Sequence, residues 1–230
     1  MKSILSESTF FGVLISIIGY EIGLYLKRKL KLTIFNPLLI SIIFVIAVLL
    51  IFHVKYDSYN NGARYLSYLL TPATICLAIP LYEQMDLLKN NLRAILTGII
   101  SGVLTSLGSV LILSVLFHFS HKEYVTLLPK SITTAIGMGV SEELGGIVTI
   151  TVTVIIVTGV IGNIIAEKVC KIFRITDPVA KGIALGTAAH AVGTAKAMEM
   201  GEIEGAMSSL AIAVAGLITV VGASVFANFF

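Results

Sequence analysis

Charged residues are scarce in this chain. Of its 230 residues, 13% are Asp, Glu, Lys or Arg, whereas 57% are hydrophobic. A soluble globular domain carries about 25% charged residues, so the composition excludes that class of protein. Apolar runs long enough to cross a bilayer as helices are present instead. The sequence therefore predicts an all-α polytopic membrane protein.

Cysteine is equally rare, since the chain contains two, Cys76 and Cys170. They are far apart and show no ligand-type spacing, so neither a disulfide framework nor a zinc site is indicated. No HExxH, P-loop or Rossmann glycine pattern occurs at a strand–helix junction. We therefore expect no catalytic residues, no metal and no cofactor, and no enzyme. The net charge of +3 is small and gives no indication of nucleic-acid binding.

Six apolar stretches are long enough to cross a membrane, because a core about 30 Å thick needs roughly 20 apolar residues. The first is followed by the basic run KRKLK, which is typical of a stop-transfer flank and not of a cleaved signal peptide. The third contains Pro72 and Pro80, which predict a kink or an interruption. The six expected spans are residues 8–26, 34–53, 65–82, 94–117, 147–166 and 205–230.

The basic residues predict how these spans are oriented. The loops after the first, third and fifth spans hold nine Lys and Arg residues. The opposite side holds five, which are Lys2, Lys55, Arg64, Lys122 and Lys130. The positive-inside rule places the larger set in the cytoplasm, and both chain termini outside. This orientation requires residues 131–146 and 178–201 to enter the membrane and return, the first from outside and the second from inside.

These two stretches also resemble each other. Residues 135–145 read AIGMGVSEELG and residues 191–201 read AVGTAKAMEMG. One full crossing separates them, so they have opposite orientations, and together they predict an inverted-topology repeat of the kind found in many secondary transporters. The alternative is chance similarity between two segments rich in Gly and Ala. The identical pairs are Ala135 and Ala191, Gly137 and Gly193, Glu143 and Glu199, and Gly145 and Gly201.

Two broken hairpins that meet near the membrane midplane point the ends of their helices at a common site. Helix amino termini carry partial positive charge and free N–H groups, which favour an anion. Hydroxyl groups can cap these ends or contact a carboxylate, and a basic side chain can balance its charge. The predicted substrate-binding residues are Ser131, Thr133, Thr134, Thr187, His190 and Lys196.

The repeat-equivalent acids Glu143 and Glu199 have two interpretations. A carboxylate at mid-membrane costs several kcal/mol and usually serves a function. Burial also raises its pKa, which suits proton coupling. The alternative is that both are solvated residues at the ends of the hairpins. For Glu142, Glu202 and Glu204 we expect the solvated role.

The chain is expected to divide into two parts. Residues 1–126 would form amino-terminal transmembrane helices that serve as a scaffold or in oligomerisation, and residues 127–230 a transport-like core built from the inverted repeat.

Two local signals predict where individual helices begin. Asp177-Pro178 and Asn36-Pro37 each predict a helix that begins with a capping side chain followed by proline.

The stretches LLPKSITTAIGMGVSEELGG and FRITDPVAKGIALGTAAHAVGTAKAMEMGEIEGAMSS closely resemble the LrgB/CidB family of bacterial membrane proteins. The resemblance covers essentially the whole chain, and SEELGG and GTAKAMEM look more like the CidB branch. It implies a small holin-like partner of the LrgA/CidA type and a link to murein hydrolase activity, autolysis and programmed cell death. Relatives implicated in pyruvate, glycolate and glycerate movement imply a small 2-oxo- or 2-hydroxy-carboxylate as cargo. The family supplies no settled site residues, so the predicted site rests on the repeat.

Two functions therefore stay open. The first is a secondary transporter of small monocarboxylates in the bacterial cell membrane, acting with the holin-like partner. The second is a holin-like or antiholin-like protein that modulates murein hydrolase export without a specific substrate. Membrane lipid surrounds the protein in either case. The prevalence of twofold assemblies favours a homodimer or a higher oligomer.

Overall fold

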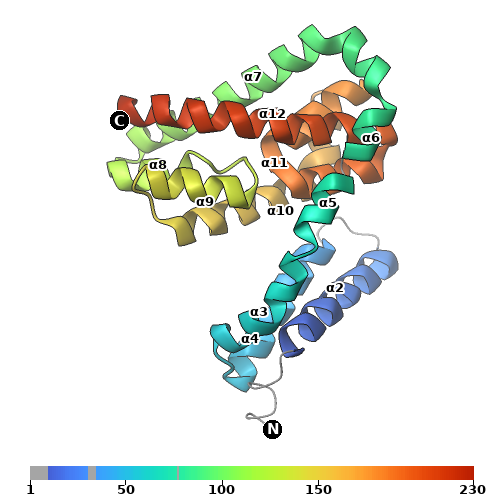
Figure 1. Ribbon diagram of the computed structural model, residues 1–230, viewed down its shortest axis with the longest axis vertical. Helices are drawn as coiled ribbons and strands as arrows, with labels where there is room; N and C mark the ends of the chain where they lie inside the picture. Colours follow the sequence, from blue (N-terminus) through green and yellow to red (C-terminus); the bar gives the residue numbers. More distant parts are fainter. Residues whose placement is uncertain (1–9, 31–34, 77) are drawn as a thin grey trace. The chain divides into compact units, whose positions relative to one another are not determined.

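The computed structural model describes residues 10–30, 35–76 and 78–230, and every regular element among them is a helix (Figure 1). The chain divides into two compact units, Met1–Cys76 and Leu77–Phe230. Two predicted spans begin outside the described residues, at positions 8, 9 and 34. The basic residues Lys2 and Lys31 also lie outside them, and so does residue 77, which belongs to the predicted third span. The proposal that residues 1–126 and 127–230 have separate roles stays a prediction.

The described part of the first unit contains four helices. They are α2 (Phe11–Leu30), α3 (Pro37–Phe52), α4 (Tyr56–Ser67) and α5 (Leu70–Cys76). As the Asn36-Pro37 pair predicts, the Asn36 side chain accepts hydrogen bonds from the N–H groups of Leu38 and Leu39. Helices α2 and α3 approach so closely that a Cβ on Gly23 would lie 2.7 Å from the Pro37 carbonyl oxygen.

The second unit contains the long helices. Its elements are α6 (Ala78–Glu83), α7 (Met85–Leu116), α8 (His121–Leu127), α9 (Thr134–Glu143), α10 (Val148–Ile172), α11 (Pro178–Met200), α12 (Glu202–Phe226) and the 3-10 helix η1 (Ala227–Phe229). Within the predicted third span the regular α-helix is interrupted at Tyr68 and Leu69, between α4 and α5, which agrees with the interruption expected from Pro72. The effect of Pro80 stays a prediction, because residue 77 lies outside the described residues.

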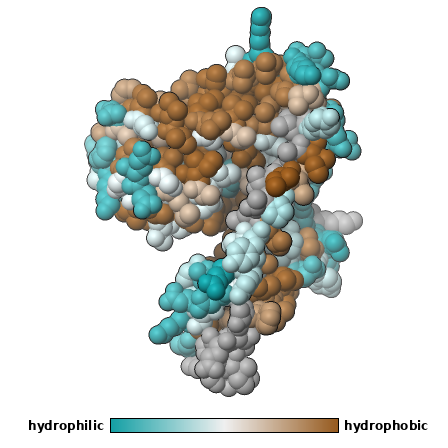
Figure 2. Space-filling model, viewed as in Figure 1, coloured by the Kyte–Doolittle hydropathy of each residue, from teal (hydrophilic) through white to brown (hydrophobic). Residues whose placement is uncertain are grey.

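Three of the described helices are long and apolar enough to cross a membrane. They are Met85–Leu116, Val148–Ile172 and Glu202–Phe229, and Pro37–Phe52 is a shorter apolar helix. Exposed apolar side chains cover much of the second unit on the face that Figure 2 shows. Such a surface suits lipid and not water. The all-α membrane fold is thus confirmed, and the count of six crossings stays a prediction.

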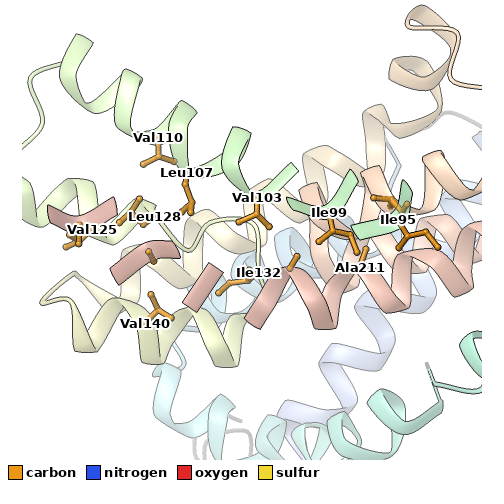
Figure 3. Packing of buried hydrophobic residues seen from close by; sticks show 14 of the residues in the cluster. Ile95, Ile99, Val103, Leu107, Val110, Val125, Leu128, Ile132, Val140 and Ala211 are labelled. Atoms are coloured by element: carbon orange, nitrogen blue, oxygen red, sulfur yellow. The ribbon is translucent and has the colours of Figure 1, made fainter. Parts of the chain in front are cut away.

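Apolar side chains that lie three or four positions apart, on one face of α7, form the centre of the core of the second unit. Small residues let α12 pack against this core, and close packing is what holds helices together inside a bilayer. Figure 3 shows Ile95, Ile99, Val103, Leu107 and Val110 of α7 with Leu128, Ile132, Val140 and Ala211.

Helix α11 reverses direction. Asp177 caps its first turn by accepting from the Ala180 N–H, as predicted, but Ala189 and His190 leave the helical conformation. A Cβ on Gly182, before the break, would touch the Glu204 carbonyl oxygen. Met198, after the break, lies against Gly205 of the same turn of α12. Residues 178–188 and 191–200 are therefore the two limbs of a hairpin, as the sequence predicts for residues 178–201.

Helix α8 and the segment that follows it form another hairpin with α9. The Thr151 hydroxyl of α10 lies 2.8 Å from the Thr126 carbonyl oxygen of α8 and 2.7 Å from the Ser141 hydroxyl of α9. Thr126, in the last turn of α8, and Ser141, in the last turn of α9, therefore lie together at the start of α10. Pro129 lies against Gly137, so the segment after α8 runs back along α9. The predicted range, 131–146, contained only the connection and the second limb. The first limb was missed because its start, HKEY, reads as a polar loop.

Candidate functional site

A cavity of about 1080 Å³ lies within the second unit. Its walls come from α7, the α8–α9 connection, α10, the first limb of α11 and the start of α12. Isoleucine side chains of α10, α11 and α12 supply apolar surface, whereas α7 supplies most of the hydroxyl groups. The hydroxyl residues that line the cavity are Ser101, Thr105, Ser106, Ser109, Ser131, Thr158 and Thr187.

The two hairpins reach this cavity at neighbouring turns of α7. The Ser106 hydroxyl donates to the Ser131 hydroxyl oxygen at 3.0 Å, which fixes the tip of the first hairpin. One turn earlier, a Cβ on Gly102 would lie 3.0 Å from the Thr187 hydroxyl oxygen, near the tip of the second. Both α7 positions are close to the middle of that 32-residue helix. The cavity therefore lies where the hairpins converge, midway along a membrane-length helix.

Lys130 brings a positive charge to this place. It lines the cavity beside Ser131, and its ammonium group donates to the Ser131 hydroxyl oxygen at 3.0 Å. Sequence reasoning had counted Lys130 among the basic residues of an outer loop. Its position directly before the predicted site residue Ser131 was the one available signal. The other charged residue of the wall is Asp177, which caps α11.

Two of the six predicted substrate-binding residues line the cavity, Ser131 and Thr187. Thr187 is buried, and its hydroxyl donates to the Ile183 carbonyl oxygen at 2.7 Å. Thr133 precedes α9 as its N-cap residue, but its side chain makes no capping hydrogen bond. Thr134 begins the helix, and neither threonine belongs to the cavity wall.

His190 and Lys196 do not line the cavity either. The His190 ring lies 2.9 Å from the Ile155 carbonyl oxygen and is 4% exposed, at a left-handed φ of 41°. A Cβ on Gly159 would lie 2.7 Å from that ring, so the small residue makes room for it. His190 thus anchors the second hairpin to α10 at its turning point.

Lys196 lies within an ionic cluster. Its ammonium group is 2.5 Å from the Glu167 carboxylate of α10 and 3.3 Å from that of Glu199. The second limb of α11 is thereby tied to α10 near the end of that helix. This arrangement does not favour Lys196 as a counter-ion for a ligand in the cavity.

The acidic residues lie outside the cavity wall as well. Glu143 is exposed at the last turn of α9, and the Glu199 side chain is 49% exposed. Glu142 and Glu202 are exposed, as expected. The expectation for Glu204 was wrong, because it is 9% exposed and its carboxylate lies 3.7 Å from the Lys181 ammonium group. In the part of the chain that the structure describes, no three His, Cys, Asp or Glu side chains gather as a metal site requires.

Comparison with known proteins gives a match along nearly the whole sequence. Residues 16–229 match the LrgB-like family. The chain is 39% identical over 220 residues to the antiholin-like protein LrgB of Bacillus subtilis (strain 168), which covers 95% of each chain. It is also 39% identical over 221 residues to the antiholin-like proteins LrgB of Bacillus mycoides (strain KBAB4) and Bacillus cereus (strain B4264), covering 96% of each chain. No solved structure matches it.

Proposed function

Because the chain belongs to the LrgB-like family, we propose that it is a secondary transporter of small monocarboxylates such as pyruvate or glycolate. In this proposal it acts as a multi-pass protein of the bacterial cell membrane, together with a small holin-like partner of the LrgA/CidA type. Flux of the carboxylate then influences autolysis. Whether it follows the CidB-like branch stays a prediction, since the three relatives carry the name LrgB.

The cavity between the hairpin tips carries this proposal. Broken helices that meet at mid-membrane are the usual place of the substrate in secondary transporters. Non-helical backbone, such as that at Ala189 and His190, is tolerated at membrane depth where it is buried in protein or lines a wet space. A volume of about 1080 Å³ readily holds a three-carbon acid with water.

The contacts of the two hairpins support an internal repeat. The spacing of Ala135 and Ala191 is 56 positions, and this shift carries α9 onto the second limb of α11 and α10 largely onto α12. It also carries Thr126, which contacts the start of α10, onto Gly182, which contacts the start of α12. Each hairpin would then pack on the helix that follows it. An inverted pair of this kind can alternate its access to the two sides of a membrane.

The proposed orientation places the amino and carboxyl termini outside the cell. The carboxyl-terminal end of α12 fits this arrangement, since the Tyr124 hydroxyl of α8 donates to the Phe226 carbonyl oxygen at 2.8 Å. In the proposed topology both groups belong to the outer side. Association into a homodimer or a higher oligomer remains part of the proposal.

The second candidate is an antiholin-like protein that modulates murein hydrolase export and programmed cell death without a specific substrate. The name of the Bacillus relatives favours it. This function needs assembly with other membrane proteins and makes no use of a cavity. Filling the cavity therefore separates the two candidates.

The test is uptake of labelled pyruvate into proteoliposomes that hold this chain, with and without the holin-like partner. Gly102→Leu would fill the space beside Thr187, whereas Gly108→Leu is the matched control, because nothing lies within 4 Å of a Cβ at Gly108. We expect saturable uptake that Gly102→Leu abolishes and Gly108→Leu leaves intact. Glu143→Gln and Glu199→Gln test the proposed proton coupling by their effect on uptake driven by a pH gradient. Absence of saturable uptake in both preparations, with leakage of unrelated dyes, would refute the carrier and favour the second candidate.

A further inference from the structure

The tip of the first hairpin presents hydrogen-bond donors to the cavity for which the described residues supply no acceptor. The Ser131 hydroxyl oxygen accepts from both the Lys130 ammonium group and the Ser106 hydroxyl, each at 3.0 Å. Since that oxygen already accepts two hydrogen bonds, its own hydrogen is directed elsewhere. Two further N–H groups of the Lys130 ammonium also have no acceptor in the part of the chain that the structure describes. These donors converge beside the cavity, and Ser131 itself is 7% exposed.

The charge of Lys130 is also uncompensated within the described part of the chain. The other two lysines that are largely shielded in this unit each have a carboxylate, Lys181 with Glu204 at 3.7 Å and Lys196 with Glu167 at 2.5 Å. No described carboxylate lies within ion-pair distance of Lys130. A shielded cation without a counter-ion is costly, so this place favours an anion that arrives from outside the chain.

We infer that the Lys130 ammonium group and the Ser131 hydroxyl, which Ser106 holds in place, form the subsite for the single carboxylate group of the transported acid. This inference rests on the proposed transport function and names the part of the cavity that recognises its substrate. A carboxylate accepts from the ammonium and the Ser131 hydroxyl together, in the charge-assisted hydrogen bonds that are the stronger kind.

The rest of the cavity wall makes the site selective for monoanions. Lys130 is the single Lys or Arg among the described lining residues, so a second carboxylate would meet no cation. Thr105 and Ser109 instead flank Ser106 on α7 and suit an uncharged oxygen, such as a 2-oxo or 2-hydroxy group. Asp177 at the wall adds a negative charge that disfavours a dianion.

The experiment measures equilibrium binding of labelled pyruvate to purified protein, beside uptake in proteoliposomes, for wild type, Lys130→Gln, Lys130→Arg and Ser131→Ala. Lys122→Gln is the matched control, because Lys122 is exposed on α8 and does not line the cavity. We expect Lys130→Gln to weaken binding at least roughly tenfold, Lys130→Arg to restore part of it, and the control to bind normally. Unlabelled lactate should compete, whereas succinate and the neutral methyl ester of pyruvate should not.

The outcomes separate this inference from the proposed function. Saturable uptake by wild type together with undiminished binding and uptake by a folded Lys130→Gln variant would overturn the subsite and leave the transporter standing. Effective competition by succinate would likewise overturn the single-charge site. Binding that depends on Lys130 without any uptake would support the subsite and refute transport. No binding to wild type at all would overturn the subsite, and the uptake assay alone would then decide on transport.

Discussion

Adding one methyl group to Gly186 tests the hairpin of α11 more directly than any larger change. Gly186 belongs to the first limb of α11, where the chain packs against α12. A Cβ at this position would lie 2.5 Å from the Ser208 carbonyl oxygen and 2.7 Å from the Ala211 Cβ. Ordinary contacts between such atoms are about 3.5 Å, so the two helices must separate by roughly 1 Å.

Separation of the helices cannot be avoided by a side-chain rotation, because the Ser208 oxygen belongs to the backbone of α12. Overpacking of this kind costs about 1–3 kcal/mol, which outweighs the gain of up to about 1 kcal/mol that alanine brings to a helix interior. Gly186→Ala is therefore expected to destabilise the protein. At Gly108 of α7 a Cβ meets no atom within 4 Å. Gly108→Ala therefore gains the higher helix propensity of alanine without an overpacking cost.

The measurement is unfolding of the two variants and the wild type by denaturant in one detergent, followed by circular dichroism. We expect Gly186→Ala to unfold at lower denaturant than wild type and Gly108→Ala at the same or higher. Since both changes add the same group to a helix, the intrinsic preference for alanine cancels in the comparison. If Gly186→Ala were as stable as Gly108→Ala, the close packing of α11 on α12, and with it the reversal of α11, would be refuted.

Three further changes probe the hairpins. Thr151→Val should destabilise the first hairpin by about 1–3 kcal/mol, because it leaves the carbonyl and hydroxyl partners of the Thr151 side chain without a hydrogen bond; an unchanged unfolding midpoint would contradict this. Lys196→Gln removes the ion pair with Glu167 and should speed hydrogen exchange in the second limb of α11, while equal exchange in variant and wild type would show that the pair does not hold that limb. Hydrogen bonds from the Ser120 backbone N–H and hydroxyl lower the pKa of Glu123. The contribution of Glu123 to α8 is therefore present above its unfolded pKa and is lost as pH falls through the lower folded pKa. Lowering the pH should thus reduce the protection of the α8 amides, measured relative to their intrinsic exchange rate at each pH, more in the wild type than in Glu123→Gln, and identical protection profiles would argue against this capping role.

Local signals predicted much of the fold. The scarcity of charge and the apolar runs predicted an all-α membrane protein, and the three longest apolar helices correspond to the last three predicted spans. Capping side chains followed by proline predicted where α3 and α11 begin, because a cap is satisfied within its own first turn. The polar, glycine-rich character of residues 178–201 predicted a broken element, since such a stretch makes a poor continuous span.

The candidate site was predicted less well, because its residues come together from separate helices. The run of serine and threonine at residues 131–134 directed attention to Ser131, and the repeat to Thr187, both of which line the cavity. The same reasoning chose His190 and Lys196 for their charge, but these side chains contact α10. Sequence alone does not tell whether a basic group meets a ligand or a carboxylate of its own chain.

The sequence by itself determined the class of protein, the positions of most helices and the fact that residues 178–201 turn back on themselves, since each depends on the composition of a short stretch. The tertiary structure alone decided that Lys130 faces a cavity. That position depends on the hydrogen bond between Ser131 and Ser106, which are 25 residues apart, and on the tip of the other hairpin reaching the same part of α7. The physical reason is that the hydropathy pattern specifies which residues leave water, whereas the packing of whole helices specifies which polar groups they bring together.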